Sequence, residues 1–400
     1  MNSKKYSLVI ISIIVFISTI KVTSLFYNNT PSITSDKLLT DSITTTINPA
    51  FDDTQSIAIS KTENFTTNSI PPEKQKSRLT QIIENCMSNI AVADNDGLTE
   101  NDDITNSDDF TGSNIAAQLD AYLTNLKLSN NSSDMLALFM QNYQASNTVN
   151  SDFIFELPST TLHKEILFEQ QLAMCSASFN AKYCNEQLYA QANYIDKDNA
   201  YWWFLIAQIH LSQNNIPDAT EAFYVAKNKA NYNEYYFEKI NFIEQNAEQH
   251  SSLSTNIRLV HAIGVSSRFN LNYGKLVDYC KDNLDDLELA DVCLQIGIKL
   301  EHSATTLLAH SIGLTLQEIN YQHHLKYDLV AETKIKQNAR RDTIINNSDY
   351  RAVVLLMALD ERLARTWLNA GLSKGELFAI SQTINEAKVF AQDINYLPCQ

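Results

Sequence analysis

The sequence predicts an all-α protein, and three observations support this fold class. Apolar residues recur at helical spacing along most of the chain from about residue 76 onward. Glycine and proline are scarce, with 8 and 7 among 400 residues, whereas sandwiches, barrels and α/β folds need many turns or glycine-rich connections. Hydrophobic residues make up 44% of the chain, which is enough for a sizeable core. We therefore expect helical hairpins that stack against one another as an irregular solenoid.

The formal charge of −16, from 46 acidic and 30 basic residues, bears on the partners that the surface can attract. A net-negative surface repels the phosphate backbone, so we expect no nucleic acid partner. The same charge is also what ordinary solubility requires, and it therefore selects no particular protein partner.

Residues 1–27 have the pattern of a segment that directs a chain to a membrane. Lys4 and Lys5 precede an apolar run over residues 6–20, as in a secretory signal peptide or an uncleaved signal anchor. With the apolar residues that follow, the segment is long enough to span a bilayer. Residues 22–24 are the best cleavage site for a signal peptide. Both readings place the rest of the chain outside the inner membrane.

Residues 28–75 differ in composition from everything that follows. They are rich in serine, threonine and asparagine and show little periodicity. Such a segment cannot bury enough apolar surface to offset the entropy lost on ordering. We expect a flexible linker between the N-terminal segment and the folded part.

Residues 76–159 are expected to form N-terminal helices around an acidic loop. Helices are predicted over about 73–90, 113–128 and 133–146. The acidic stretch 94–109 contains Asp94-Asn95-Asp96-Gly97, which is typical of the start of a calcium loop. The EF-hand pattern fails at its first position, where Val92 stands, so we expect a solvated loop and no metal site.

The stretch 200–226 predicts two short amphipathic helices joined by a turn at 214–218, where Pro217 lies close to a helix start. Its order of large, apolar and small residues resembles the tetratricopeptide repeat, and residues of similar character stand 34 positions earlier. The resemblance implies tetratricopeptide-like repeats over residues 160–249. The residues that would form the repeat core are Leu172, Ala173, Tyr189, Ala192, Trp203, Ile206, Ala207, Ala219, Phe223 and Ala226.

The C-terminal region, residues 250–400, continues the helical pattern. Its strongest helix follows Ser348, where apolar residues form one broad stripe, and it is expected to stop at Gly371. The other helices of this region are predicted over 275–282, 287–300, 304–317 and 374–394.

Six cysteines in an exported chain suggest disulfide bonds. Cys175 ends one predicted helix and Cys184 begins its hairpin partner, and Cys280 and Cys293 repeat that arrangement. Helix ends joined by a short turn come within disulfide reach, so we predict the bonds Cys175–Cys184 and Cys280–Cys293. Short-spaced cysteines that bridge paired helices loosely resemble those of Sel1-like repeat proteins. A third bond between the two remaining cysteines, Cys86 and Cys399, stays open, as does the alternative of buried free thiols.

No motif in the sequence carries catalytic, metal or cofactor chemistry. There is no phosphate-binding glycine loop, no His-Glu-x-x-His and no Gly-x-Ser-x-Gly pattern. His302 and His310 could share a helical face, but two turns apart they are too distant to hold one metal. Asp360, Glu361 and Arg362 are expected on the solvated face of an amphipathic helix. We therefore expect no cofactor, no metal and no enzymatic activity.

The sequence favours an interaction scaffold in the bacterial cell envelope. Stacked helical hairpins form an extended concave surface that can hold a peptide or a helix of a partner protein. Trp203 and Phe204 are expected in the core. Tyr201 and Trp202 are predicted either to contact a partner or to pack between helices. The side chains predicted to contact a partner are Tyr201, Trp202, Gln208 and Gln213.

Two other functions are also compatible with the sequence. An exported enzyme on an all-α scaffold, such as a polysaccharide-degrading one, would need paired carboxylates in a deep cleft lined by aromatic side chains. A purely structural envelope protein would need no ligand. For each function the N-terminal segment predicts an inner-membrane protein with its bulk in the periplasm, or a periplasmic protein if the segment is cleaved.

Overall fold

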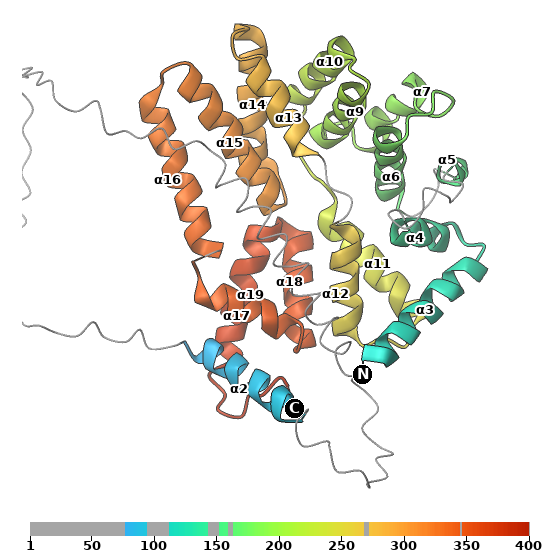
Figure 1. Cartoon of the computed structure of the whole chain (residues 1–400), viewed down its shortest axis with the longest axis vertical. Coiled ribbons are helices and arrows are strands. Elements are labelled where there is room, and N and C mark those ends of the chain that lie inside the picture. The colour runs from blue at the N-terminus through green and yellow to red at the C-terminus, as the bar shows by residue number, and fades with distance from the viewer. Residues whose placement is uncertain are drawn as a thin grey trace, which may run out of the picture.

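The computed structural model is all-helical, with no β-strand among the residues that it describes (Figure 1). The described residues are 77–93, 112–142, 152–158, 163–267, 272–344 and 346–399. The predicted all-α class is therefore confirmed for this part of the chain. The N-terminal segment 1–27, the linker 28–75 and the acidic stretch 94–109 lie outside the described residues.

The helices follow one another with short connections. The N-terminal and central helices are α2 (Arg78–Ala93), α3 (Gly112–Leu128), α4 (Ser132–Asn142), α5 (Phe153–Glu156), α6 (Lys164–Ala177), α7 (Glu186–Tyr189), α8 (Ala192–Ile195), α9 (Ala200–Ser212) and α10 (Ile216–Lys227). The later helices are α11 (Tyr236–His250), α12 (Thr255–Ser266), α13 (Tyr273–Asp282), α14 (Leu287–Ser303), α15 (Leu307–His323), α16 (Tyr327–Ile344), α17 (Ser348–Met357), α18 (Glu361–Lys374) and α19 (Glu376–Phe390). None of the described helices has the length and apolar character needed to cross a membrane.

Two hydrophobic cores hold these helices together. One core joins elements that are far apart in the sequence, because α2, α3 and α4 share it with α11, α12, α17, α18 and α19 (Figure 1). The other lies among the central helices α6, α9, α10, α13, α14 and α15. Tyr232 and Tyr235, just before α11, pack into the central core, whereas Phe237 and Ile240 of α11 pack into the first. The start of α11 therefore lies at the boundary between the two cores.

Small residues let the central hairpins close tightly. In the α9–α10 hairpin, Ala207 and Ala219 are completely buried. In the α14–α15 hairpin, a Cβ added to Gly313 would lie 2.6 Å from the carbonyl oxygen of Gly297, so only glycine fits between these backbones. Asn215 caps α10 by accepting a hydrogen bond from the backbone N–H of Asp218, which fits the predicted turn.

The prediction of one helix from Ser348 to Gly371 is wrong, because the structure has two helices, α17 and α18. Asp360 separates them: its carboxylate caps α18 by accepting from the backbone N–H of Arg362 at 2.9 Å. Gly371 lies inside α18, where a Cβ would come 2.0 Å from the ring of Phe237. The helix instead ends at Gly375, whose φ of 79° is in the left-handed region.

The prediction that residues 360–362 lie on a solvated helix face is also wrong for Asp360. Asp360 is only 7% exposed and is held by the guanidinium of Arg362 at 2.8 Å and the hydroxyl of Tyr396 at 2.7 Å. Although burial opposes ionisation, these hydrogen bonds leave the pKa of Asp360 below its usual value. The carboxylate therefore connects the start of α18 to the C-terminal segment.

All six cysteines lie in pairs at disulfide distance. Cys175–Cys184 and Cys280–Cys293, with Cα–Cα distances of 5.6 and 5.7 Å, are the two local pairs that the sequence predicts. The third pair, Cys86–Cys399, joins α2 to the C-terminal segment across 313 positions of sequence. Three such pairs indicate an oxidising compartment, either extracellular or periplasmic.

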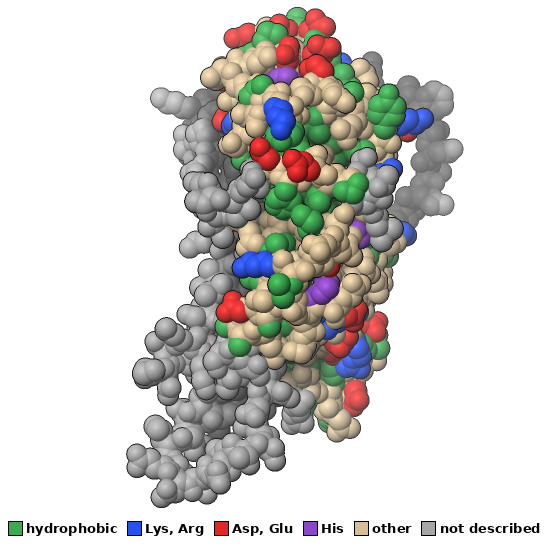
Figure 2. Space-filling view, turned by 90° about the vertical axis from the view of Figure 1, so that its right-hand side faces the viewer, with side chains coloured by type: hydrophobic (Ala, Val, Ile, Leu, Met, Phe, Trp, Pro, Cys, Tyr) green, Lys and Arg blue, Asp and Glu red, His purple; other side chains and the backbone are tan. Residues whose placement is uncertain are grey.

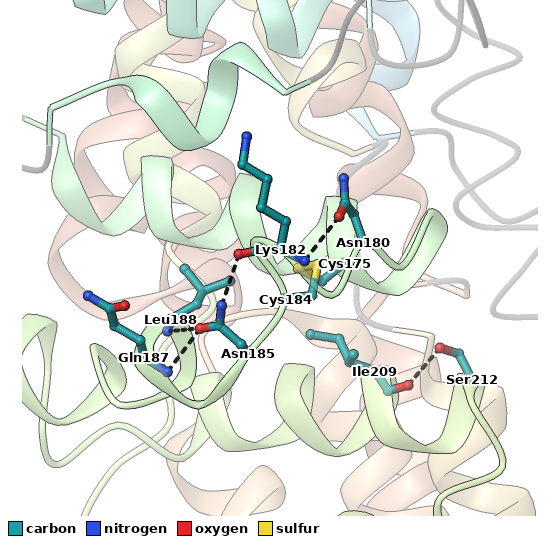
Figure 3. The surroundings of a disulfide bond; sticks show 9 residues. All are labelled: Cys175, Asn180, Lys182, Cys184, Asn185, Gln187, Leu188, Ile209 and Ser212. Atoms are coloured by element: carbon teal, nitrogen blue, oxygen red, sulfur yellow. Dashed lines mark hydrogen bonds between the residues drawn. A yellow bond between two sulfur atoms is a disulfide. The ribbon is translucent and has the colours of Figure 1, made fainter.

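The turn closed by the first pair explains why its hairpin differs from the α9–α10 hairpin. Asn180 accepts from the backbone N–H of Lys182, and Asn185 donates to the carbonyl of Lys182 while capping α7 (Figure 3). Instead of one continuous second helix, two one-turn helices follow, α7 and α8. Tyr189 and Ala192, which the repeat resemblance places on one helix, belong to these two separate turns, and both are buried.

Candidate binding groove

An open groove of about 570 Å³ lies between α3 and the C-terminal end of α11. Three of its residues, Ala117, Ala121 and Asn125, follow at intervals of four and therefore line one face of α3. The lining carries amide, hydroxyl, imidazole and methyl groups and no acidic side chain, lysine or arginine. The complete lining is Ala117, Gln118, Ala121, Asn125, Gln249, His250, Ser251 and Ser252.

His250 is the last residue of α11, and its ring is anchored to a buried carboxylate below the groove. Its Nε2 lies 3.0 Å from Oδ1 of Asp134, a residue of α4 that is only 4% exposed. The same carboxylate accepts from the hydroxyl of Ser129 at 2.6 Å and from the side-chain amide of Asn246 at 2.7 Å. Three donors thus satisfy this buried acid, and they fix the orientation of the imidazole.

The hydrogen-bond network continues from Asn246 into α3. The hydroxyl of Tyr122, which is completely buried, donates to the Asn246 carbonyl at 2.8 Å. Burial, with a smaller contribution from the charge of Asp134, raises the pKa of Tyr122, so this hydroxyl stays protonated and remains a donor. At the surface, the Asn125 side-chain amide donates to the backbone carbonyl of His250 at 2.9 Å. The network therefore holds α3, α4 and α11 at fixed positions around the groove.

The outer nitrogen of His250 gives the groove a chemically reactive hydrogen-bonding group. The side chain is 26% exposed, and Nδ1 has no hydrogen-bond partner in the described part of the chain. Because the carboxylate of Asp134 accepts the hydrogen of Nε2, the neutral ring presents Nδ1 as an acceptor. The protonated ring would present the same atom as a donor.

A second buried polar cluster lies near the start of α11, and it has no opening to solvent. The ammonium of Lys239 donates to Glu169 of α6 at 2.6 Å, and both side chains are almost fully buried. The hydroxyl of Tyr201 of α9 donates to the same carboxylate oxygen. Burial raises the pKa of Glu169 against the opposing effect of Lys239. We call Glu169, Lys239 and Tyr201 the sealed cluster.

The central helices also bury a carboxylate just before α11. Glu234 accepts from the backbone N–H groups and hydroxyls of Thr305 and Thr306, at 2.6 to 3.3 Å. The hydroxyl of Tyr273 donates to it at 2.9 Å. Since Thr306 caps α15, Glu234 occupies the N-terminal end of that helix, where a negative charge is stabilised.

Two of the predicted partner-contact residues do not reach the surface. Tyr201 and Trp202 are 1% and 0% exposed, so the expectation that they contact a partner is wrong. Trp202 stacks on Tyr235 with ring centroids 5.2 Å apart and meets the edge of Phe168. The cause is that α6 and the segment before α11 cover this side of α9, which is hydrophobic almost all round.

The other two predicted contacts are half-buried and lie outside the groove. Gln208 donates to the hydroxyl of Ser176 at 3.1 Å and accepts from the backbone N–H of Asn272 at 2.9 Å, so it connects three segments. Gln213 is the C-cap residue of α9. A role of either residue in partner binding stays a prediction.

The predicted repeat-core residues are mostly interior. Leu172, Tyr189, Ala192, Ile206, Ala207, Ala219, Phe223 and Ala226 are buried. Ala173 and Trp203 are partly buried, and the ammonium of Lys229 lies 5.4 Å from the Trp203 ring centroid. This burial describes how the hairpins pack, and the tetratricopeptide resemblance itself stays a prediction.

His302 and His310 do not share a helical face, because His302 lies in α14 and His310 in α15. His310 is instead fixed by a 2.7 Å hydrogen bond between its Nδ1 and the backbone carbonyl of Glu301. Burial, assisted by the charge of Arg340, lowers the pKa of His310 to about 4. Within the described residues, no three His, Cys, Asp or Glu side chains come together as a metal site.

Comparison with known proteins gave no match for this chain, either to a protein-family model, to a curated protein or to a solved structure.

Proposed function

We propose that this protein is an exported helical scaffold of the bacterial cell envelope that binds an extended segment of a partner protein in the α3–α11 groove. The observation that carries this proposal is the uncharged hydrogen-bonding lining of the groove. An extended peptide offers a backbone N–H and C=O at every residue, and amide and hydroxyl side chains can pair with both.

The size and shape of the lining also suit a peptide. Ala117 and Ala121 leave space above α3, so a backbone can approach the helix closely. The groove has no pair of carboxylates and no aromatic side chain among its lining residues, which a polysaccharide-degrading enzyme would need. The lining therefore favours a peptide over a sugar polymer and supports a binding role over the enzymatic alternative.

The surface around the groove is consistent with contact over a wide area. Figure 2 shows the side of the molecule that carries α3 to α7, where much of the middle of the surface is uncharged, acidic side chains gather at the upper end, and acidic and basic side chains lie together at the lower right. A partner would meet few fixed charges along the middle of this face. Its binding would then depend on shape and hydrogen bonds more than on charge.

We infer that residues 1–27 act as a signal anchor or signal peptide, and that the folded part faces the periplasm, where disulfides persist. The order in which α6, α9, α10, α14, α15 and α16 pack as neighbours supports a tetratricopeptide-like solenoid in the centre of the chain.

The proposal is tested by filling the groove with a larger side chain and measuring peptide binding. A library of short random peptides is selected on the full chain, and the affinity of the recovered peptides is measured for wild type, Ala121→Trp and Ala116→Trp. Ala116 is exposed on the same helix but does not line the groove, so it is the matched control. We expect Ala121→Trp to weaken binding by more than about tenfold and the control to change it little. Equal affinity of both variants for every peptide, or no recovered peptide, would overturn the proposal.

A further inference from the structure

We propose that His250 is the specificity-determining residue of the groove, whose Nδ1 accepts a hydrogen bond from an N–H or O–H group of the bound segment, so that binding weakens as the solution becomes acidic. This inference rests on the proposed peptide-binding function and names the chemistry by which the groove recognises its ligand.

The inner nitrogen always carries a hydrogen atom. Nε2 lies 3.0 Å from the Asp134 carboxylate, whose other hydrogen bonds come from Ser129 and Asn246. A carboxylate can only accept, so the neutral ring adopts the tautomer with hydrogen on Nε2, and the protonated ring keeps it. The ring therefore stays in one orientation in both protonation states, and only the outer nitrogen changes.

The outer nitrogen changes from acceptor to donor on protonation. In the neutral ring, Nδ1 carries a free lone pair, and the partly exposed ring of His250 lines the groove together with Gln249, Ser251 and Ser252. A backbone N–H or a hydroxyl of the ligand can donate to it. In the protonated ring two donors would face each other, so the hydrogen bond is lost.

Among the described residues, the hydrogen-bond network around this ring contains two other titrating groups, Asp134 and Tyr122. Asp134 comes from α4 and Tyr122 from α3, and the ring centroid of His261 of α12 lies 6.1 Å from that of Tyr122. The guanidinium of Arg258, also on α12, is held by Glu244 and Glu248. From α18, the guanidinium of Arg365 is likewise bound to Glu244. Of the described groups named here, only His250 lines the groove.

The test uses a peptide from the groove selection as probe and compares wild type, His250→Gln and His323→Gln. The amide of a glutamine can still donate to Asp134, but it has no atom in place of Nδ1. His323 lies outside the groove, 3.2 Å from Asp285, and is the matched control. We expect wild type and the control to bind about five- to tenfold more weakly at pH 5 than at pH 8. His250→Gln should bind weakly at both.

A pH-independent wild type, tighter binding at pH 5, or an unchanged pH profile in His250→Gln would each overturn the inference. Side-chain nitrogen spectra of the full chain give a second test that needs no variant: the neutral ring of His250 should carry its hydrogen on Nε2, and the opposite tautomer would refute the argument. If Ala121→Trp does not block the peptide, the proposed function fails. If it blocks the peptide while the pH profile does not depend on His250, only the present inference fails.

Discussion

Helix α11 carries a buried carboxylate cluster near each end, and the two clusters differ in their access to solvent. Near its start, Lys239 meets Glu169 in the sealed cluster, where both side chains are almost fully buried. At its end, His250 meets Asp134, and the imidazole is 26% exposed at the groove. Both clusters join α11 to an earlier helix, α6 in the first case and α4 in the second.

This difference separates a packing role from a binding role. Taking two charges out of water is costly, and a sealed ion pair recovers that cost only through its own hydrogen bonds. It can fix how α6, α9 and α11 meet, but no ligand reaches it. The Asp134 network also positions helices, yet one of its members ends at the surface with an unused nitrogen. A polar network is suited to recognition when one partner is buried, as Asp134 is, and the other is exposed, as His250 is.

The largest effect is expected from Lys239→Met, which breaks the sealed cluster. The substitution leaves the carboxyl of Glu169 buried without its charged partner, and we expect a loss of about 3 to 5 kcal/mol in the free energy of unfolding. The loss should grow as pH rises, because burial raises the pKa of Glu169 and the unfolded chain loses its proton first. Urea unfolding at several pH values measures this.

The control for that experiment is Lys164→Met, because the Lys164 side chain is 46% exposed and pairs at 3.8 Å with Glu165, whose side chain is 27% exposed. It should change stability by less than about 1 kcal/mol. If Lys239→Met is as stable as this control, the sealed cluster does not hold the three helices together.

A smaller effect is expected from the double variant Cys175→Ser and Cys184→Ser. The bond closes a loop with a sequence separation of 9, so its removal should cost roughly 2.5 to 3 kcal/mol by the chain-entropy estimate. The bond holds the end of α6, a helix that contributes to the sealed cluster and not to the α3–α11 groove. Peptide binding in the groove should therefore stay unchanged. Loss of binding in the folded variant would show that the two ends of α11 are coupled.

The third effect concerns another carboxyl, that of Glu376 at the start of α19. Burial raises its pKa from 4.5 to about 7, although it accepts from the backbone N–H of Leu307 at 2.7 Å. The unfolded chain loses this proton first, so the stability present below about pH 4.5 is lost as pH rises through about 7. Glu376→Gln should remove this loss, which is on the order of 3 kcal/mol.

The matched control is Glu361→Gln, at the corresponding first position of α18, where the side chain is 56% exposed. We expect its unfolding free energy to follow the wild-type pH dependence. Thermal unfolding between pH 4.5 and pH 8 compares the three proteins, and a Glu376→Gln profile parallel to wild type would contradict the assignment.

The sequence was sufficient for those features that depend on neighbours along the chain. The all-α class follows from helical periodicity and few turn residues, and the Cys175–Cys184 and Cys280–Cys293 pairs follow from short hairpin turns. The burial of Trp202 also had a signal, because α9 has almost no polar face and such a helix is covered on every side.

Features that depend on distant residues had no such signal. Asp134 and His250 are separated by 116 positions, and nothing in either neighbourhood indicates the other. The shared core of α2 and α17 likewise arises only when the two ends of the chain meet. The break between α17 and α18 depends on Asp360, which caps α18 and accepts a hydrogen bond from Tyr396. The sequence did not indicate this break, because the apolar stripe continues on both sides of Asp360.

The most direct test of the account is a crystal structure of the full chain with a peptide from the groove selection. We predict that the peptide lies along Ala117 and Ala121 and that one of its N–H or O–H groups stands about 3 Å from Nδ1 of His250. Nε2 should keep its contact with Asp134, and the sealed cluster should be unchanged. A peptide bound on another surface, or one that leaves Nδ1 without a contact, would contradict the account.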